Sequence, residues 1–444
     1  MSDASTVAVL EGLVGTLRDA IANAPGHKTP ALTALRTSAL AWFDTNGLPN
    51  PRSEDWKYTN VRPIARRDFS LGSEHDSTSD ISEYSNFGAG PDAACTIVLV
   101  DGVVAQISSE VPDGLTLLPL GEALTRHGDS LKELVGQVAD ASADGFAALN
   151  AASLDQGVYI KVRDGVQIPQ PINVICVGKT DGVAALPRLL IDVGQDASAH
   201  VVEHYVGDAQ ATYMTNVVVE INLAERAKLE LSKLQEEGVK AFHISTTAAR
   251  LAEHAELVSN ALSFGAAIAR HDINAWFSAP NGNIVLNGLY MGSGRQHVDF
   301  HTRLFHGATD CTSEQVYKGI LDGHARGVFN GQVHVEPDAQ RTQADQSNHN
   351  LLLSRNAEID TKPQLEIYAD DVKCSHGTTV GQLDEQMLFY LRSRGIPLAE
   401  ARGMLTYGFA HDIVERLSLD ALRVRAEATL TNILPETGGL GETH

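Results

Sequence analysis

The sequence predicts a mainly β protein built as a β-helix, a solenoid of stacked coils, with helical segments at both ends. The first observation is that short runs rich in Val, Ile and Leu recur between turns, at 158–162, 172–177, 189–193, 201–206 and 217–223. The second is an internal echo, in which similar segments begin at Ala197, Ala227, Ala255 and Gly282, which are 30, 28 and 27 residues apart. A period of this length suits a coil that carries more than one strand.

The composition agrees with a folded chain of considerable size. The 444 residues are enough for two or three domains, or for one elongated repeat architecture with caps. With 43% hydrophobic and 20% charged residues, the chain can bury a substantial core and lacks the character of a disordered protein.

The formal charge of −22 excludes a general attraction to phosphate backbones or anionic lipid, so nucleic acid and membrane surfaces are not expected partners. No apolar run approaches the length of a membrane span, and the first residues lack the basic start and apolar segment of a signal peptide. We therefore expect a cytoplasmic protein.

The four cysteines, Cys95, Cys176, Cys311 and Cys374, are scattered and form no Cys-x-x-Cys pair. This fits a reducing compartment and argues against a disulfide framework or a self-contained zinc or iron–sulfur site. Any metal cluster would have to be shared or transient.

The N-terminal region begins with two expected helices. Residues 5–22 carry an apolar stripe, and a second helix begins at Thr29-Pro30 and ends near Gly47. The segment 52–59 that follows is dense in charged and aromatic residues, and is either a packed connector, which we favour, or an interaction patch.

A stretch rich in Ser, Gly and Asp over 70–91 predicts a linker or long surface loop, and with it a domain boundary near residue 90. We expect an N-terminal helical domain with its linker over 1–90 and a β-helix core over 91–380. Within that core, 95–104 has the character of a strand and 129–152 that of a helical insertion.

The C-terminal region, 381–444, is expected to form a helical domain. Asp384 caps a helix that runs through Arg394, Gly395 ends it, and Pro397 opens a second helix, with a last helix from about 419 to 430. Each solenoid coil leaves an unpaired edge, so both ends need covering, and the helical segments would provide the covers. The second helix has an apolar stripe that fits a core, and the hairpin is equally a docking surface for another protein.

The pair Cys374 and His376 is the sharpest candidate for chemistry. If residues 372–376 are extended, a period of two turns both side chains to one face, near enough to touch a single ion or partner group. The alternative is a small buried thiol beside a hydrogen-bonded histidine, and the spacing alone leaves both readings open.

A different class of function is a metal-dependent β-helix enzyme that acts on carbohydrate. Its ligands would come from the histidines that are frequent in one region, His297, His301, His306, His324, His334 and His349. Asp299 or Glu336 would supply the carboxylate, but no tight ligand spacing repeats, so stacked structural histidines are favoured. The glycines at 319–327 lack the lysine and hydroxyl residue of a Walker A loop, so we expect no nucleotide bound by this chain.

Several blocks in one order resemble the SufB/SufD family of iron–sulfur cluster assembly scaffolds. They are Tyr317–Ile320, Val328–Gly331, Ala339–Gln340 with Thr342, Asn350–Ser354, Pro363–Ile367, Asp370–Gly377 and Phe389–Ile396. The segment 53–59 is similar to one typical of the SufD branch. Ala357 stands where the SufB branch has a sulfur-accepting cysteine, and only His376 remains of a Glu-His-Glu run, so the SufD branch fits better.

The resemblance implies a right-handed parallel β-helix with helical terminal domains. It implies a non-catalytic scaffold, with no catalytic residues, that pairs with a SufB-like chain and helps iron acquisition. His376, with Cys374 as a further candidate, would then lie at the interface where a transient iron–sulfur cluster or iron is shared with the partner. Without that partner a homodimer through the same edge stays open.

The resemblance also implies that the C-terminal helices, over 386–416, bind a SufC-like ABC ATPase, which would supply the missing ATP site. The expected contact residues are Phe389, Tyr390, Arg394, Gly395, Ile396 and Phe409.

Overall fold

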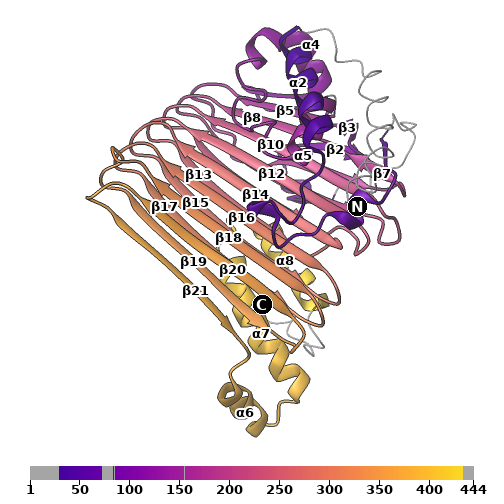
Figure 1. The fold of residues 1–444 in the computed structure, drawn as a ribbon, viewed down its shortest axis with the longest axis vertical. Coiled ribbons are helices and arrows are strands. Elements are labelled where there is room, and N and C mark those ends of the chain that lie inside the picture. The colour runs from indigo at the N-terminus through magenta and orange to yellow at the C-terminus, as the bar shows by residue number, and fades with distance from the viewer. Residues whose placement is uncertain (1–29, 73–83, 85, 155, 434–444) are drawn as a thin grey trace.

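The computed structural model describes residues 30–72, 84, 86–154 and 156–433, and the helix expected over 5–22 lies outside them. Two long sheets face each other and form a flattened β-solenoid, with helices at either end of the chain (Figure 1). The predicted β-solenoid with N- and C-terminal helices is therefore confirmed.

The strands alternate between the two sheets, so each coil contributes one strand to each. Sheet A contains β1 (Ser70–Leu71), β4 (Leu115–Pro119), β5 (Gly157–Val162), β7 (Val183–Ala185), β8 (Arg188–Val193), β10 (Met214–Leu223), β12 (Phe242–Leu251), β14 (Ile268–Phe277), β16 (His297–His306), β18 (Arg326–Val335) and β20 (Glu358–Ile367). Sheet B contains β2 (Cys95–Val100), β3 (Val103–Ile107), β6 (Ile172–Gly178), β9 (Ser198–Gly207), β11 (Lys228–Gln235), β13 (Glu256–Ser263), β15 (Asn283–Gly292), β17 (Thr312–Leu321), β19 (Gln343–Leu352) and β21 (Lys373–Gly381). The strands from β5 to β20 in sheet A, and from β6 to β21 in sheet B, pair in parallel. Two strands pair in the antiparallel direction, β3 with β2 and β4 with β5.

The internal echo in the sequence marks the turns that lead into sheet B. Lys228 is in register with Ser198 and with Glu256, so equivalent positions of successive echoes stack directly. The residue before each echo has a left-handed backbone, and so has the corresponding residue of the next two coils. Their φ values lie between 55° and 62°, at Asp196, Arg226, His254, Asn281, Asp310 and Arg341. The next residue is buried and small, as at Ala227 and Ala255. A repeated sharp turn over a small side chain sets the coil period.

The inward faces of both sheets form the main core. Side chains two apart along each strand meet those of the opposite sheet, as Val298 and Phe300 on β16 do with Tyr290 and Tyr317 of sheet B. The strands therefore alternate between this interior and the outer faces, which helices and connecting segments cover.

Apart from α6, which packs mainly on α7, the α-helices lie on the outer faces of the sheets. The helices of the structure are α2 (Pro30–Asn46), η1 (Glu54–Trp56), α3 (Arg62–Ala65), η3 (Gly90–Asp92), α4 (Leu120–Leu131), α5 (Gly145–Ser153), α6 (Glu385–Ser393), α7 (Leu398–Val414) and α8 (Asp420–Ile433). In the N-terminal group, α4 packs on Leu190 and Val218, and Phe146 of α5 packs near Met214 of sheet A. In the C-terminal group, α7 and α8 bury Ile413, Leu422 and their neighbours against sheet B.

The insertion expected to be helical over 129–152 is helical only at its two ends. It consists of the end of α4, a run of turns, and α5, whose N-cap Asp144 accepts from the backbone N–H of Phe146 and Ala147. The turns wrap around a buried carboxylate, because Glu220 on β10 accepts from the N–H groups of Gly136 and its neighbours at 2.9–3.1 Å. The apolar residues in 131–138 are buried, as the periodicity indicated. The backbone around them is organised by the carboxylate of Glu220, which is distant in the sequence, rather than by a continuous helix.

The segment 52–59 is a packed connector on the outer face of sheet A. Trp56 is buried, and the guanidinium of Arg270 lies 3.8 Å from the centre of its ring. The hydroxyl of Thr59 bonds to Asp299 and to His297 on β16. Part of the expected linker is also ordered, since residues 70–71 form β1 beside β7.

The C-terminal helices begin where the sequence indicates. Asp384 caps α6 through the N–H groups of Gln386 and Met387, and Gly395, with φ of 88°, separates α6 from α7. Among the described residues, no helix has the length and apolar character needed to cross a membrane.

Candidate functional site

The two sheets end together at β20 and β21, where the solenoid stops. Each of these strands pairs on one side only within the described part of the chain, β20 with β18 and β21 with β19 (Figure 1). The C-terminal helices lie on the face of sheet B and leave this edge uncovered. A sheet edge of this kind presents backbone N–H and C=O groups to another chain. We call this surface, formed by β20 and β21, the open end.

Cys374 and His376 lie on the same face of β21 and continue the inward row of the preceding coil. On β19 the buried inward residues are Ala344, Gln346, Asn348 and Asn350. Their partners on β21 are Cys374, His376, Thr378 and Val380. These four side chains therefore point into the interior between the two sheets, and His376 is exposed because no further coil among the described residues stacks on it.

Sheet A contributes a matching row from β20. The inward residues Gly327, Phe329, Gly331, Val333 and Val335 of β18 are in register with Ile359, Thr361, Pro363, Leu365 and Ile367. The hydroxyl of Thr361 lies 3.1 Å from that of Thr378 and donates to Asn348 at 3.0 Å, which ties the two sheets together at the open end. The surface is thus a cross-section of the core, half apolar and half polar.

Cys374 and His376 differ in how ready they are to bind a metal. The thiol of Cys374 is half-buried among Val333, Val335 and Ala344, and burial raises its pKa above the ordinary value. Cys374 is therefore a protonated thiol at neutral pH, and a metal would have to displace its proton. His376 is exposed, so its imidazole is accessible from solvent.

His376 stands at the end of a column of buried amides. Gln346, its partner in the ladder, is 1% exposed, and neither polar atom of its side chain is hydrogen-bonded to any described residue. Gln346 is itself in register with Gln315, whose carbonyl oxygen accepts from Thr302 at 2.6 Å. Gly331 makes room for Gln346, because a Cβ there would lie 2.2 Å from its Nε2. Sequence reasoning missed this column, although the alternation along 343–350 pointed to it.

The acidic residues beside this pair are part of a turn. Asp370 and Asp371 are exposed, and the backbone of Asp371 bonds to Arg341 and Gln340. Over the described residues, no group of three or more His, Cys, Asp or Glu side chains is arranged to hold a metal ion. Among the described residues, Cys374 and His376 can therefore supply only part of a ligand set.

Three of the histidines considered for a metal enzyme, His301, His306 and His334, have structural partners. Asp299 is buried and bonds to Arg270 at 2.9 Å, and it lies 3.0 Å from Nε2 of His301. His334 lies between Glu336, at 3.2 Å, and Glu366, at 3.1 Å. His306 bonds to the hydroxyl of Ser313 inside the solenoid.

The second exposed apolar surface is on α6. Phe389 is 75% exposed and Tyr390 56% exposed, and they line a shallow depression with residues 385, 386 and 393. Arg394 donates to the hydroxyl of Tyr390 at 2.7 Å, and the helix packs mainly on α7. A large exposed aromatic patch on an isolated helix is typical of a protein-binding surface.

Phe409 lies apart from that surface. Its backbone carbonyl accepts from the ammonium of Lys318 on β17 at 3.0 Å, and the same ammonium lies 4.7 Å from the centre of its ring. Lys318 also pairs with Asp412 at 2.8 Å. Phe409 therefore fastens α7 to sheet B, whereas Gly395 and Ile396 form the bend that carries α6.

Comparison with known proteins gives the same family on both halves of the chain. A model described as "SUF system FeS cluster assembly, SufBD core domain" matches residues 176–409, and one for the "SufBD protein N-terminal region" matches residues 16–174. The chain belongs to the SufBD family. Its role lies in SUF-type iron–sulfur cluster assembly.

Curated relatives in this family span most of the chain. The iron–sulfur cluster assembly protein SufD of Escherichia coli strain K12 is 33% identical over 88% of this chain and 90% of its own length. The chloroplastic protein ABCI7 of Arabidopsis thaliana is 28% identical over 95% of this chain and 90% of its own. SufD of Bacillus subtilis strain 168 is 25% identical over 89% and 93%. The resemblance to SufBD proteins noted in the sequence is thereby confirmed.

Proposed function

We propose that this chain is a non-catalytic, SufD-type scaffold subunit that pairs with a SufB-like chain through the open end. The observation that carries the proposal is that β20 and β21 each have one edge without a partner strand in the described part of the chain, with a half-exposed cross-section of core between them. A second solenoid ending in the same way would bury both cross-sections and satisfy both edges. Without such a partner, the same edge offers itself to a second copy of this chain.

The nascent iron–sulfur cluster is the cargo of this interface. His376 is exposed at the open end and binds iron through a neutral imidazole, which is a good ligand for this metal. Cys374 joins only when the metal displaces its proton, because burial holds its pKa above the ordinary value. The partner supplies the remaining ligands, so the cluster is shared and transient, and this chain helps to acquire the iron.

The ATPase partner binds the surface of α6 and the bend at Gly395. This chain lacks a Walker A motif, so the energy of ATP comes from a SufC-like subunit docked on Phe389 and Tyr390. Movement of α6 reaches the solenoid through α7, which the Lys318–Asp412 pair fastens to β17, two strands from β21. ATP binding and hydrolysis would then shift the population of open and closed interfaces. This assembly works in the cytoplasm, an expectation that the four scattered cysteines support.

The experiment is cluster formation on the purified assembly of this chain with its SufB-like and SufC-like partners. Iron, sulfide and cluster absorbance are measured for wild type, His376→Ala and the control His324→Ala, which removes an exposed histidine from a distant turn. We expect all three assemblies to form and only His376→Ala to lose cluster, by about tenfold or more. Equal cluster content in His376→Ala and wild type would contradict the role of His376.

A further inference from the structure

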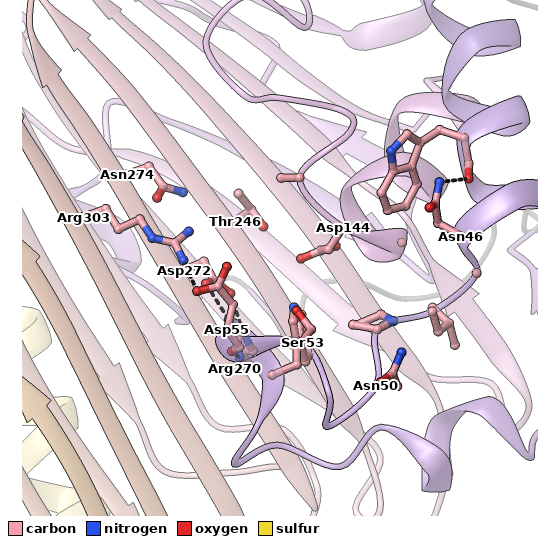
Figure 2. A pocket seen from close by; sticks show the side chains of 17 residues that line it. Asn46, Asn50, Ser53, Asp55, Asp144, Thr246, Arg270, Asp272, Asn274 and Arg303 are labelled. Carbon is pink, nitrogen blue, oxygen red and sulfur yellow. Dashed lines mark hydrogen bonds and ion pairs between the residues drawn. The ribbon is translucent and has the colours of Figure 1, made fainter.

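A polar cavity of about 280 Å³ lies between the N-terminal helices and the outer face of sheet A. Its walls come from the end of α2, the segment before η1, the turn that precedes α5, and strands β12, β14 and β16 (Figure 2). It is on the side of the molecule opposite to α7 and α8, and none of its residues belongs to the open end or to α6. Nothing in the proposed scaffold function uses it.

Arg270 and Asp272 form the floor of this cavity and are already satisfied. Four hydrogen bonds run from Arg270, two of them to the carboxylate oxygens of Asp272 at 2.7 and 2.8 Å. The guanidinium also lies against the ring of Trp56. Because an arginine has five N–H donors, Arg270 has almost none left for a ligand.

Arg303, at one side of the cavity, has donors to spare. Within the described residues it makes one hydrogen bond, from Nη2 to Asp55, and its side chain is 28% exposed. The planar guanidinium therefore keeps N–H groups in a geometry that suits a carboxylate. This side of the cavity is therefore suited to an anion.

Asp144, on the other side, has an acceptor to spare. Its Oδ1 accepts the backbone N–H groups of Phe146 and Ala147 at 2.7 and 2.9 Å, and Oδ2 has no hydrogen bond with the described residues. Figure 2 shows Asp144 and Arg303 well apart in the cavity, with Thr246 between them in this view. Burial, together with the carboxylate of Asp272, raises the pKa of Asp144, so a cation at Oδ2 would relieve an unfavourable charge.

Neutral hydrogen-bonding groups line the middle. Thr246 on β12 and Asn274 on β14 are partly exposed, and their side chains bond to no other described residue. Neighbouring strands are about 4.8 Å apart, so the span from β12 to Arg303 on β16 is about 10 Å. Three carboxylates (Asp55, Asp144 and Asp272) face two guanidinium groups, which disfavours phosphates and other polyanions.

We propose that this cavity binds a small zwitterion of amino-acid to dipeptide size, with its ammonium group at Asp144 and its carboxylate at Arg303. Thr246 and Asn274 bond to the polar groups between the two ends. The site is independent of the open end, so the chain can bind such a molecule whether or not it pairs with a partner.

The test is calorimetric titration of the purified full-length chain with the twenty amino acids and a set of dipeptides. Asp144→Asn removes the charge but keeps a good cap for α5, and Arg303→Gln removes the guanidinium. The matched controls are Asp140→Asn, in the turn nearby, and Arg226→Gln, on a distant turn, neither of which lines the cavity. We expect saturable binding by at least one zwitterion, with the dissociation constant raised about tenfold or more in both cavity variants and unchanged in both controls.

Analogues that lack one charge separate the two ends. Removal of the amino group from the best ligand should weaken binding to wild type but not further to Asp144→Asn, and removal of the carboxylate should do the same at Arg303→Gln. The proposal is overturned if no amino acid or dipeptide binds, or if the cavity variants bind as the wild type does. It is equally overturned if the amine or the carboxylate alone binds as well as the zwitterion.

Discussion

His376 is the direct ladder partner of Gln346, a buried amide whose side chain has no hydrogen bond to any described residue. The imidazole is therefore the last member of a polar column that runs inside the solenoid through Gln315. The backbone of His376 is held in the β-ladder, and its side chain is exposed. That combination is what a site shared between two chains needs.

Pairing through the open end predicts that a charge placed in its cross-section blocks the partner. Val380 is 49% exposed and lies in the same row as His376, so Val380→Asp costs this chain little packing. We expect affinity for the SufB-like chain to fall about tenfold or more, because a carboxylate would be buried without a partner. Binding of the ATPase should be unchanged.

The control is Val239→Asp, which makes the same change at a residue that is 63% exposed before β12, far from the open end. Co-purification and surface plasmon resonance measure both interactions. Loss of SufB-like binding in both variants, or in neither, would speak against the open end as the interface.

Docking of the ATPase on α6 predicts that Phe389→Asp weakens binding of the ATPase and leaves binding of the SufB-like chain unchanged. Phe389 is 75% exposed, so its replacement should leave the fold and the SufB-like partner in place while SufC-like binding falls about a hundredfold. Val424→Asp, at a residue that is 65% exposed on α8, is the control. Retained ATPase binding by Phe389→Asp would rule out this helix as the docking surface.

Two glycines predict opposite effects of the same substitution on stability. A Cβ on Gly319 would lie 2.3 Å from the ring of Tyr290, inside the packed interior, so Gly319→Ala should destabilise the chain by about 1–3 kcal/mol. Gly408 lies within α7, and a Cβ there meets nothing within 4 Å. Gly408→Ala should stabilise the chain by about 0.5–1 kcal/mol, since glycine is unfavourable inside a helix. Urea unfolding of both variants measures the two signs, and equal signs would contradict the packing described.

Buried histidines predict a loss of stability in mild acid. Burial lowers the pKa of His306 to about 4, whereas in the unfolded chain it titrates near 6.5. Between these values the unfolded state binds more protons, so the free energy of unfolding decreases as the pH falls from about 6.5 to about 4. His306 alone accounts for up to about 3 kcal/mol of this decrease.

His306→Gln does not titrate and can still bond to Ser313 as Nε2 of the histidine does. The free energy of unfolding of this variant should therefore decrease less steeply with falling pH than that of wild type. The difference in slope corresponds to the uptake of up to one proton fewer on unfolding. Urea titrations at several pH values between 4 and 7 give both slopes, and identical slopes would exclude His306 as a contributor.

The coil repeat and the C-terminal caps could be predicted from the sequence because both depend on neighbouring residues. The turn before Ala227 recurs with each coil, and Asp384 caps α6 within a few residues of itself. The turns around residue 136 could not be predicted, since they are organised by Glu220, a carboxylate far away in the chain. The cavity between Asp144 and Arg303 could not be predicted either, because its lining residues come from segments that are far apart in the sequence.

For the open end, the period of two along β21 was enough to put Cys374 and His376 on one face. That the face belongs to an unfinished solenoid follows only from the strand order, because a sequence does not show where pairing stops. Phe409 illustrates the opposite case. Phe409 lies in a helix expected to dock a partner, but in the structure its ring contacts the ammonium group of Lys318.

The central claim is that this chain is one subunit of a larger scaffold. Native mass spectrometry of the chain, alone and after co-expression with SufB-like and SufC-like proteins from the same source, tests it most directly. The account predicts a complex that contains this chain, one SufB-like chain and the ATPase, and that loses only the SufB-like chain in Val380→Asp. If the chain remains a monomer or homodimer in every mixture, the scaffold account is contradicted.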